Sequence, residues 1–228
     1  MIMIQKGTLQ FLKGIAKNNH KEWLDANRTQ YDAAKLNFIE LISFCIQEHG
    51  KKDPAIAALT AKECLFRINR DIRFSKDKSP YKTNFGASIK PGGKKSNLAG
   101  YYVHIEPGGK SFVGGGMYMP EPADVQKIRQ EIDYNWEEFS GILKSRSFVK
   151  VFGSLEKWDE ITLAREPKGY DKENPAIEWL KLKSWVATAP ITDQQIVATD
   201  FPKTILQAFA ALQPLLYFLN RAVGTIDE

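Results

Sequence analysis

Residues 100–118 read GYYVHIEPGGKSFVGGGMY and contain the clearest structural pattern in the chain. From Tyr101 to Glu106, side chains suited to a core alternate with polar or amphipathic ones, which is the period-two pattern of a half-buried strand. The PGG sequence at 107–109 supplies a turn, and a returning strand begins near Ser111. The stretch therefore predicts a β-hairpin.

The strands before the hairpin are less regular in sequence. A strand is expected at residues 84–90, because the turn sequence PGG follows it directly. Residues 66–74 are expected to lie partly in the same sheet, as a strand through Asn69 that bends near Arg70 and continues as a loop to Thr83. Residues 64–119 thus predict an antiparallel β-meander of about four or more strands.

Three consecutive glycines, Gly114-Gly115-Gly116, interrupt the returning strand. They permit backbone conformations that other residues rarely adopt. We expect a wide β-bulge there, and the alternative is a nest of backbone N–H groups that binds an anion.

Helical patterns lie on both sides of the predicted meander. Residues 8–58 place apolar side chains at helical spacing, and residues 120–222 are mainly helical, with a break near Asp133-Tyr134 and a short strand near 160–163. A terminal amphipathic helix is expected over 201–219, with Pro214 inside it. This order predicts a single α+β domain over residues 1–228, in which the sheet packs against N-terminal and C-terminal helices.

The composition excludes several classes of protein. With 228 residues, 43% of them hydrophobic and 26% charged, the chain can bury a proper core and is not of a disordered or collagen-like type. No segment approaches the roughly 20 apolar residues of a membrane-spanning helix, and the N-terminus does not resemble a signal peptide. We therefore expect a cytoplasmic protein with no membrane partner. Cys45 and Cys64 are expected to be buried thiols.

The positive charge of the chain is concentrated in one segment. The formal net charge is +5, but residues 62–95 alone contain ten Lys or Arg against three Asp or Glu, a net charge of +7. The rest of the chain therefore carries a net charge of −2. One face of the protein, not its whole surface, is expected to attract anions.

The basic segment includes FRINRDIRFSKDKSPYK at residues 66–82, in which arginines recur three residues apart. A guanidinium group can bind two oxygens of a phosphate or carboxylate at once. We therefore expect the side chains of Arg67, Arg70 and Arg73 to converge on a solvent-accessible hollow that is short of internal counter-ions. Asp71 is expected to orient one arginine, with Arg70 as its partner. A strand interpretation also directs Phe66 and Phe74 to the core. The candidate ligand-binding residues are Arg67, Arg70, Asp71, Arg73, Lys78, Tyr81 and Lys82.

This motif resembles the signature of DUF2461, an uncharacterised bacterial family, in the pattern R-x-x-R-D-x-R-F at 67–74 and D-K-x-x-Y-K at 77–82. Further blocks at 18–31, 100–109 and 175–181 extend the resemblance over about residues 8–220. Asn69 departs from the resemblance, since many relatives are expected to have an aromatic residue there. The resemblance implies where the site lies, and it implies no reaction.

His104 and Glu106 are weaker candidates for catalysis. Next-but-one residues of a strand share a face, so the two side chains are expected to lie together, as a general base and its orienting partner. The alternative is an ordinary structural hydrogen bond. A metal site would need a third ligand, and neither His20 nor His49 has recognisable ligand spacing, so no metal or cofactor is expected.

The sequence is compatible with three functions. The first is binding of a small anionic ligand that carries phosphate or carboxylate, in an enzyme or a binding protein. The second is a nucleic-acid-binding module that uses the basic segment, with Tyr81 and Tyr101 as aromatic contacts. The third is a structural or interaction protein in which the arginines form internal ion pairs. We rank them in that order.

Overall fold

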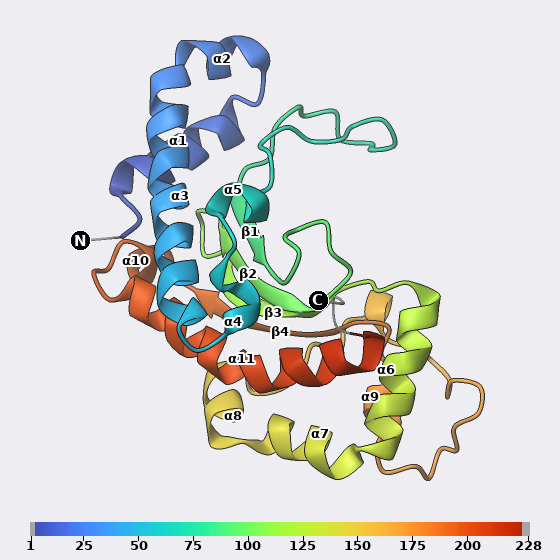
Figure 1. The fold of residues 1–228 in the computed structure, drawn as a ribbon. Coiled ribbons are helices and arrows are strands. Elements are labelled where there is room, and N and C mark those ends of the chain that lie inside the picture. The colour runs from blue at the N-terminus through green and yellow to red at the C-terminus, as the bar shows by residue number, and fades with distance from the viewer. Residues whose placement is uncertain (1–2, 225–228) are drawn as a thin grey trace.

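A four-stranded antiparallel sheet lies at the centre of the protein, whose computed structural model describes residues 3–224 (Figure 1). Its strands follow chain order and are β1 (Phe85–Ile89), β2 (Gly100–Ile105), β3 (Ser111–Met117) and β4 (Trp185–Ile191). β2 and β3 form the predicted hairpin, in which Tyr102 lies opposite Gly114 and His104 lies opposite Phe112. The α+β class and the antiparallel sheet are confirmed.

The fourth strand does not come from the predicted segment. Residues 66–74 form no strand, and the chain there makes only the isolated bridges Leu65↔Ala87 and Asn69↔Tyr81. β4 instead lies in the part expected to be mainly helical, at the edge of the sheet. Pro190 is tolerated in it because an edge strand has one side without ladder hydrogen bonds.

Two further predictions are wrong, the β-bulge at Gly114–Gly116 and the short strand near residues 160–163. Gly114–Gly116 form no bulge, since they pair in regular register with β2 and β4. A Cβ on Gly114 would lie 2.4 Å from the Ala187 carbonyl oxygen, so these glycines allow close approach of the neighbouring backbones. The short strand expected near 160–163 is a 3₁₀-helix, Asp159–Ile161, followed by an isolated bridge.

Helices come before and after the first three strands. The N-terminal ones are α1 (Lys6–Lys17), α2 (Lys21–Ala26), α3 (Arg28–Gly50), α4 (Pro54–Ala57) and α5 (Ala61–Cys64). The later ones are α6 (Pro122–Tyr134), α7 (Trp136–Lys144), α8 (Arg146–Phe152), α9 (Ile177–Leu180), α10 (Asp193–Ile196) and α11 (Phe201–Val223). The boundary between α6 and α7 confirms the predicted break at Asp133-Tyr134. α11 continues through Pro214.

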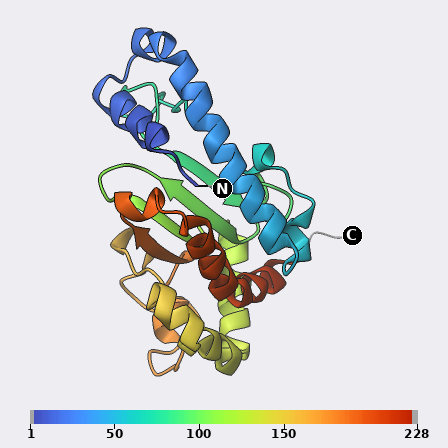
Figure 2. The same cartoon turned by 90° about the vertical axis from the view of Figure 1, so that its left-hand side faces the viewer.

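The long helices α3 and α11 contact each other and pack on the sheet (Figures 1 and 2). We call the sheet face that they cover the inner face. Tyr101, Val103 and Ile105 of β2 point to it and are fully buried. The other face, here the outer face, carries the alternate residues Tyr102 and His104, which are partly buried. No helix within residues 3–224 has the length and apolarity that crossing a bilayer requires.

Candidate functional site

The outer face carries a chain of hydrogen bonds along β2. The Tyr102 hydroxyl lies 3.2 Å from His104 Nδ1, and His104 Nε2 lies 3.0 Å from a carboxylate oxygen of Glu106. The other carboxylate oxygen of Glu106 accepts a hydrogen bond of 3.0 Å from the Thr83 hydroxyl. Strand alternation thus places His104 and Glu106 together, as the sequence predicts.

The partners of His104 fix the direction of these hydrogen bonds. A carboxylate only accepts, so His104 Nε2 carries the proton and donates to Glu106. In the neutral imidazole, Nδ1 then accepts, and the Tyr102 hydroxyl donates to it. The Phe112 ring stacks on the imidazole with 4.8 Å between centroids, which holds its plane. In this arrangement the Tyr102 hydroxyl can transfer a proton to His104, whose other nitrogen is held by Glu106.

Tyr102 forms the open end of this chain. Burial and, secondarily, the Glu106 charge raise the pKa of its hydroxyl to about 12, so it is protonated at neutral pH. The hydroxyl lies directly above Gly86 of β1, where an added Cβ would be only 2.6 Å from it. The glycine therefore makes room for the tyrosine on the sheet.

Phe66 lies next to Tyr102, and Lys82 lies over the Phe66 ring. The Phe66 ring is 6.4 Å from the Tyr102 ring, and Lys82 Nζ lies 5.1 Å from the Phe66 centroid. Burial, and then the positive charge of Arg67, lower the pKa of Lys82. Hydrogen bonds from Arg73, with a smaller contribution from the charge of Arg67, lower the pKa of Asp71. Neither Lys82 nor Arg67 forms a salt bridge with a carboxylate of residues 3–224. In the described part of the chain, Arg67 and Lys82 thus lack a salt-bridge partner.

The other two arginines of the motif have counter-ions, so the expectation that all three lack them is wrong. Arg70 pairs with Asp77 and also donates to the Ser79 carbonyl at 3.2 Å. Arg73 donates to both carboxylate oxygens of Asp71, at 3.0 and 2.6 Å. Asp71 therefore orients Arg73 and not Arg70. The cause is a reversal of the chain, in which the Arg70 N–H bonds to the Pro80 carbonyl and brings residues 77–79 beside Arg70.

Lys78 and Tyr81 are also held by the protein itself. Lys78 Nζ donates to the Ile72 carbonyl at 3.0 Å. Tyr81 is only 8% exposed and packs in the core, so its side chain does not lie on the surface of the loop. The Asn19 side chain bonds to both the N–H and the carbonyl of Tyr81, at 2.9 Å each. This link between the N-terminal helices and the motif was not predicted, and no local pattern signals it.

The aromatic residues of the motif differ from their predicted places. Phe66 is 39% exposed on the outer face, and Phe74 is 95% exposed, although a strand interpretation directs both to the core. The bend after Asn69 ends the strand pattern, which alone supported that expectation. Thr83 is the other contact that sequence reasoning missed, and its place directly after the motif is the only sequence signal for it.

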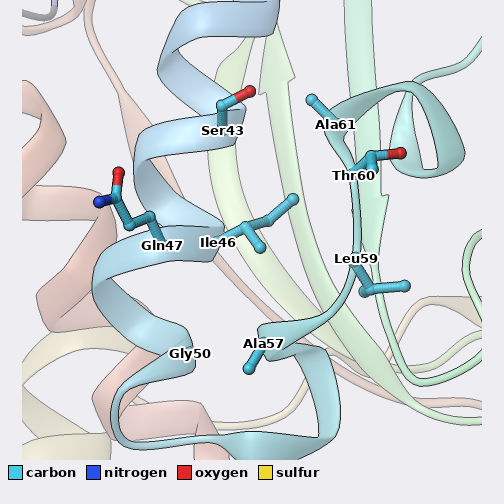
Figure 3. Close-up of a pocket in the computed structure, with 8 residues that line it drawn as sticks. All are labelled: Ser43, Ile46, Gln47, Gly50, Ala57, Leu59, Thr60 and Ala61. Atoms are coloured by element: carbon cyan, nitrogen blue, oxygen red, sulfur yellow. The ribbon is translucent and has the colours of Figure 1, made fainter.

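The remaining candidate features do not form a site. Cys45 and Cys64 are buried free thiols as predicted, and burial raises their pKa values to about 12 and about 11. In the described part of the chain, no three His, Cys, Asp or Glu side chains gather as metal ligands do. A shallow pocket of about 410 Å³ lies between α3 and the α4–α5 segment (Figure 3). None of its lining residues is charged, so it does not suit an anion.

Comparison with known proteins identifies the family. The model of the family described as "Conserved hypothetical protein (DUF2461)" matches residues 7–218, which include the arginine motif and the whole sheet. No curated protein and no solved structure matches the chain. The match extends over most of the 228 residues and confirms the resemblance seen in the motif. The chain belongs to the DUF2461 family.

Proposed function

We propose that the outer face of the sheet binds a small ligand that carries a phosphate or carboxylate group. Arg67 and Lys82 supply the positive charge, and Tyr102 faces the bound ligand. The observation that supports this proposal is that Lys82 lies over the Phe66 ring beside Tyr102, while neither Lys82 nor Arg67 forms a salt bridge within residues 3–224. Of the three arginines predicted to hold the ligand, this site uses only Arg67, because Arg70 and Arg73 are paired with Asp77 and Asp71 in their own loop.

Electrostatics favours an anion at this place. Burial of Lys82 disfavours its charged form, and the positive charge of Arg67 adds to this effect. An anion bound between the two cations reverses the sign of this effect. Hydrogen bonds to charged groups contribute about 1.5–3 kcal/mol each, and a guanidinium can form two parallel ones with phosphate or carboxylate.

The hydrogen-bonded chain beside the cations supports acid–base chemistry on the ligand. A ligand hydroxyl next to Tyr102 would pass its proton to the tyrosine oxygen while Tyr102 passes its own proton to His104 Nδ1. Glu106 would then stabilise the imidazolium, because its carboxylate already accepts from Nε2 at 3.0 Å. In this proposal Arg70, Asp71, Arg73 and Lys78 shape the loop and do not hold the ligand.

The test is a titration of the protein with inorganic phosphate, pyrophosphate and citrate, followed by calorimetry and by thermal unfolding. The variants are Arg67→Gln, Lys82→Gln and the two combined, and Arg73→Gln is the matched control in the same motif. Each lost charge-assisted contact is expected to weaken binding about 10- to 100-fold, and the control is expected to bind as the wild type does. Equal binding by the wild type and the double variant would refute the proposal.

A further inference from the structure

The proposed anion site leaves one exposed feature unexplained, the segment Arg70–Pro80, which we call the basic loop. Phe74, in the middle of this loop, is 95% exposed. Figure 1 shows the chain between α5 and β1 projecting away from the sheet. A fully exposed phenylalanine contributes nothing to the core, so its contacts are available to a partner.

The basic loop is braced from within. Arg70 pairs with Asp77, Arg73 pairs with Asp71, and Lys78 donates to the Ile72 carbonyl. The backbone N–H of Arg70 also closes the base of the loop by donating to the Pro80 carbonyl at 2.9 Å. The loop therefore presents Phe74 in a fixed arrangement, which reduces the conformational entropy lost when a partner binds.

Positive charge surrounds the exposed ring. The basic loop, residues 70–80, contains four Lys or Arg and two Asp, a net charge of +2. The Arg73 guanidinium carbon lies 5.8 Å from the Phe74 centroid, and Lys82 Nζ lies 5.1 Å from that of Phe66. Aromatic rings and cations thus alternate from the outer face of the sheet into the basic loop.

We propose that the basic loop binds single-stranded nucleic acid, with a base stacked on Phe74 and a phosphate in contact with the exposed Lys76. Single strands expose bases for stacking and carry a phosphate at every nucleotide, so they match alternating aromatic and cationic side chains. A membrane surface fits less well, because insertion needs a broad apolar face and Ile72, the nearest other apolar side chain of the loop, is partly buried. This inference rests on Phe74 and is independent of the anion site.

The first experiment measures fluorescence anisotropy of a labelled 12-nucleotide single strand, as DNA and as RNA, on the full chain at about 50 mM salt. Phe74→Ala is expected to weaken binding about 5- to 150-fold, which corresponds to the loss of one stacked base. The matched control is Tyr134→Ala in α6, because Tyr134 is also highly exposed, at 74%, and lies outside the loop. It is expected to bind like the wild type.

The second experiment follows the salt dependence of the same binding. Lys76→Gln is expected to make the slope of log affinity against log salt shallower by about 0.7, the value for one phosphate contact on a single strand. The control is Lys150→Gln, an exposed lysine of α8. Unchanged affinity of Phe74→Ala would overturn the inference. So would binding of phosphatidylserine vesicles that depends on Phe74 when the oligonucleotide does not bind.

Discussion

Tyr101 and Tyr102 are neighbours in β2, and each hydroxyl lies within hydrogen-bond distance of a histidine, yet the two sites differ in access. On the inner face, Tyr101 is 1% exposed, donates to Asp53 at 2.7 Å and lies 3.0 Å from His49 Nε2. On the outer face, Tyr102 contacts His104, and the proposed ligand site lies beside it. The same kinds of side chain thus form a sealed network and an accessible one.

The difference shows that burial and completeness of partners decide what such a cluster does. Asp53 also accepts from the Tyr217 hydroxyl at 2.9 Å and from a backbone N–H, and the Phe209 ring stacks on Tyr101 with centroids 4.5 Å apart. Burial and the Asp53 contact hold the pKa of Tyr101 far above its usual range. Tyr101, His49 and Asp53 are each at most 2% exposed, so their hydrogen bonds satisfy polar groups inside the protein.

The largest expected effect comes from removing each hydroxyl in turn. Tyr101→Phe is expected to lower the free energy of unfolding by about 3 kcal/mol, because buried Asp53 loses a donor and His49 loses its acceptor. Tyr102→Phe is expected to cost only about 0.5–1 kcal/mol, since it removes one neutral hydrogen bond at a partly buried place. Urea denaturation of both variants measures this, and similar losses would show that the two faces do not differ as described.

A smaller effect is expected from the pH dependence of the inner network. Burial lowers the pKa of His49 below its ordinary value of 6.5. Below about pH 6.5 the unfolded chain therefore binds a proton that the folded chain does not, and stability falls as the pH falls. This group contributes a loss of up to about 2 kcal/mol between pH 8 and pH 5.

The measurement for His49 is urea denaturation at pH 5 and at pH 8. His49→Gln is expected to be less stable at both values but to lose less stability between them than the wild type does. The depressed pKa values of exposed carboxylates such as Asp77, at about 2, act only at lower pH and do not enter this window. An equal loss in the wild type and the variant would assign the pH dependence to other groups.

The smallest effect on stability is expected from Gly86→Ala, which acts on the outer face alone. The new Cβ would lie 2.6 Å from the Tyr102 hydroxyl, so the ring must shift and its hydrogen bond to His104 is lost. Since the ring can move, the stability is expected to change by less than about 1 kcal/mol. Binding of pyrophosphate, by contrast, is expected to weaken.

The control for Gly86→Ala is Gly141→Ala in α7, where an added Cβ meets no other atom within 4 Å. Calorimetric titration of both variants with pyrophosphate separates the effect of Tyr102 from that of a methyl group elsewhere. If Gly86→Ala binds pyrophosphate as tightly as the control does, Tyr102 does not border the bound ligand.

Local sequence patterns predicted the parts of the fold that depend on neighbouring residues. The alternation in β2 and the glycine turn after it define the hairpin and also bring His104 and Glu106 together. β4 was missed because its first three residues are all buried, which removes the alternation, and because Pro190 argues against a strand. Its place depends on pairing with β3, some seventy residues earlier in the chain.

In the arginine motif, too, local sequence does not determine contacts that depend on the path of the chain. Its composition correctly indicated a local excess of cations, but which cation meets which carboxylate depends on the reversal of the chain between Arg70 and Pro80. A strand interpretation of the motif directs Phe74 to the core by alternation, but the chain forms a loop there and Phe74 is 95% exposed.

The most direct test of the anion site uses the three histidines of the chain as probes. NMR spectra of the imidazole groups are recorded while inorganic pyrophosphate is added to the wild type and to the Arg67→Gln, Lys82→Gln double variant. We predict that the His104 resonances shift in the wild type, that those of His49 stay in place, and that the double variant shows no shift. An unmoved His104 at saturating pyrophosphate, or equal shifts in both proteins, would contradict the proposed site.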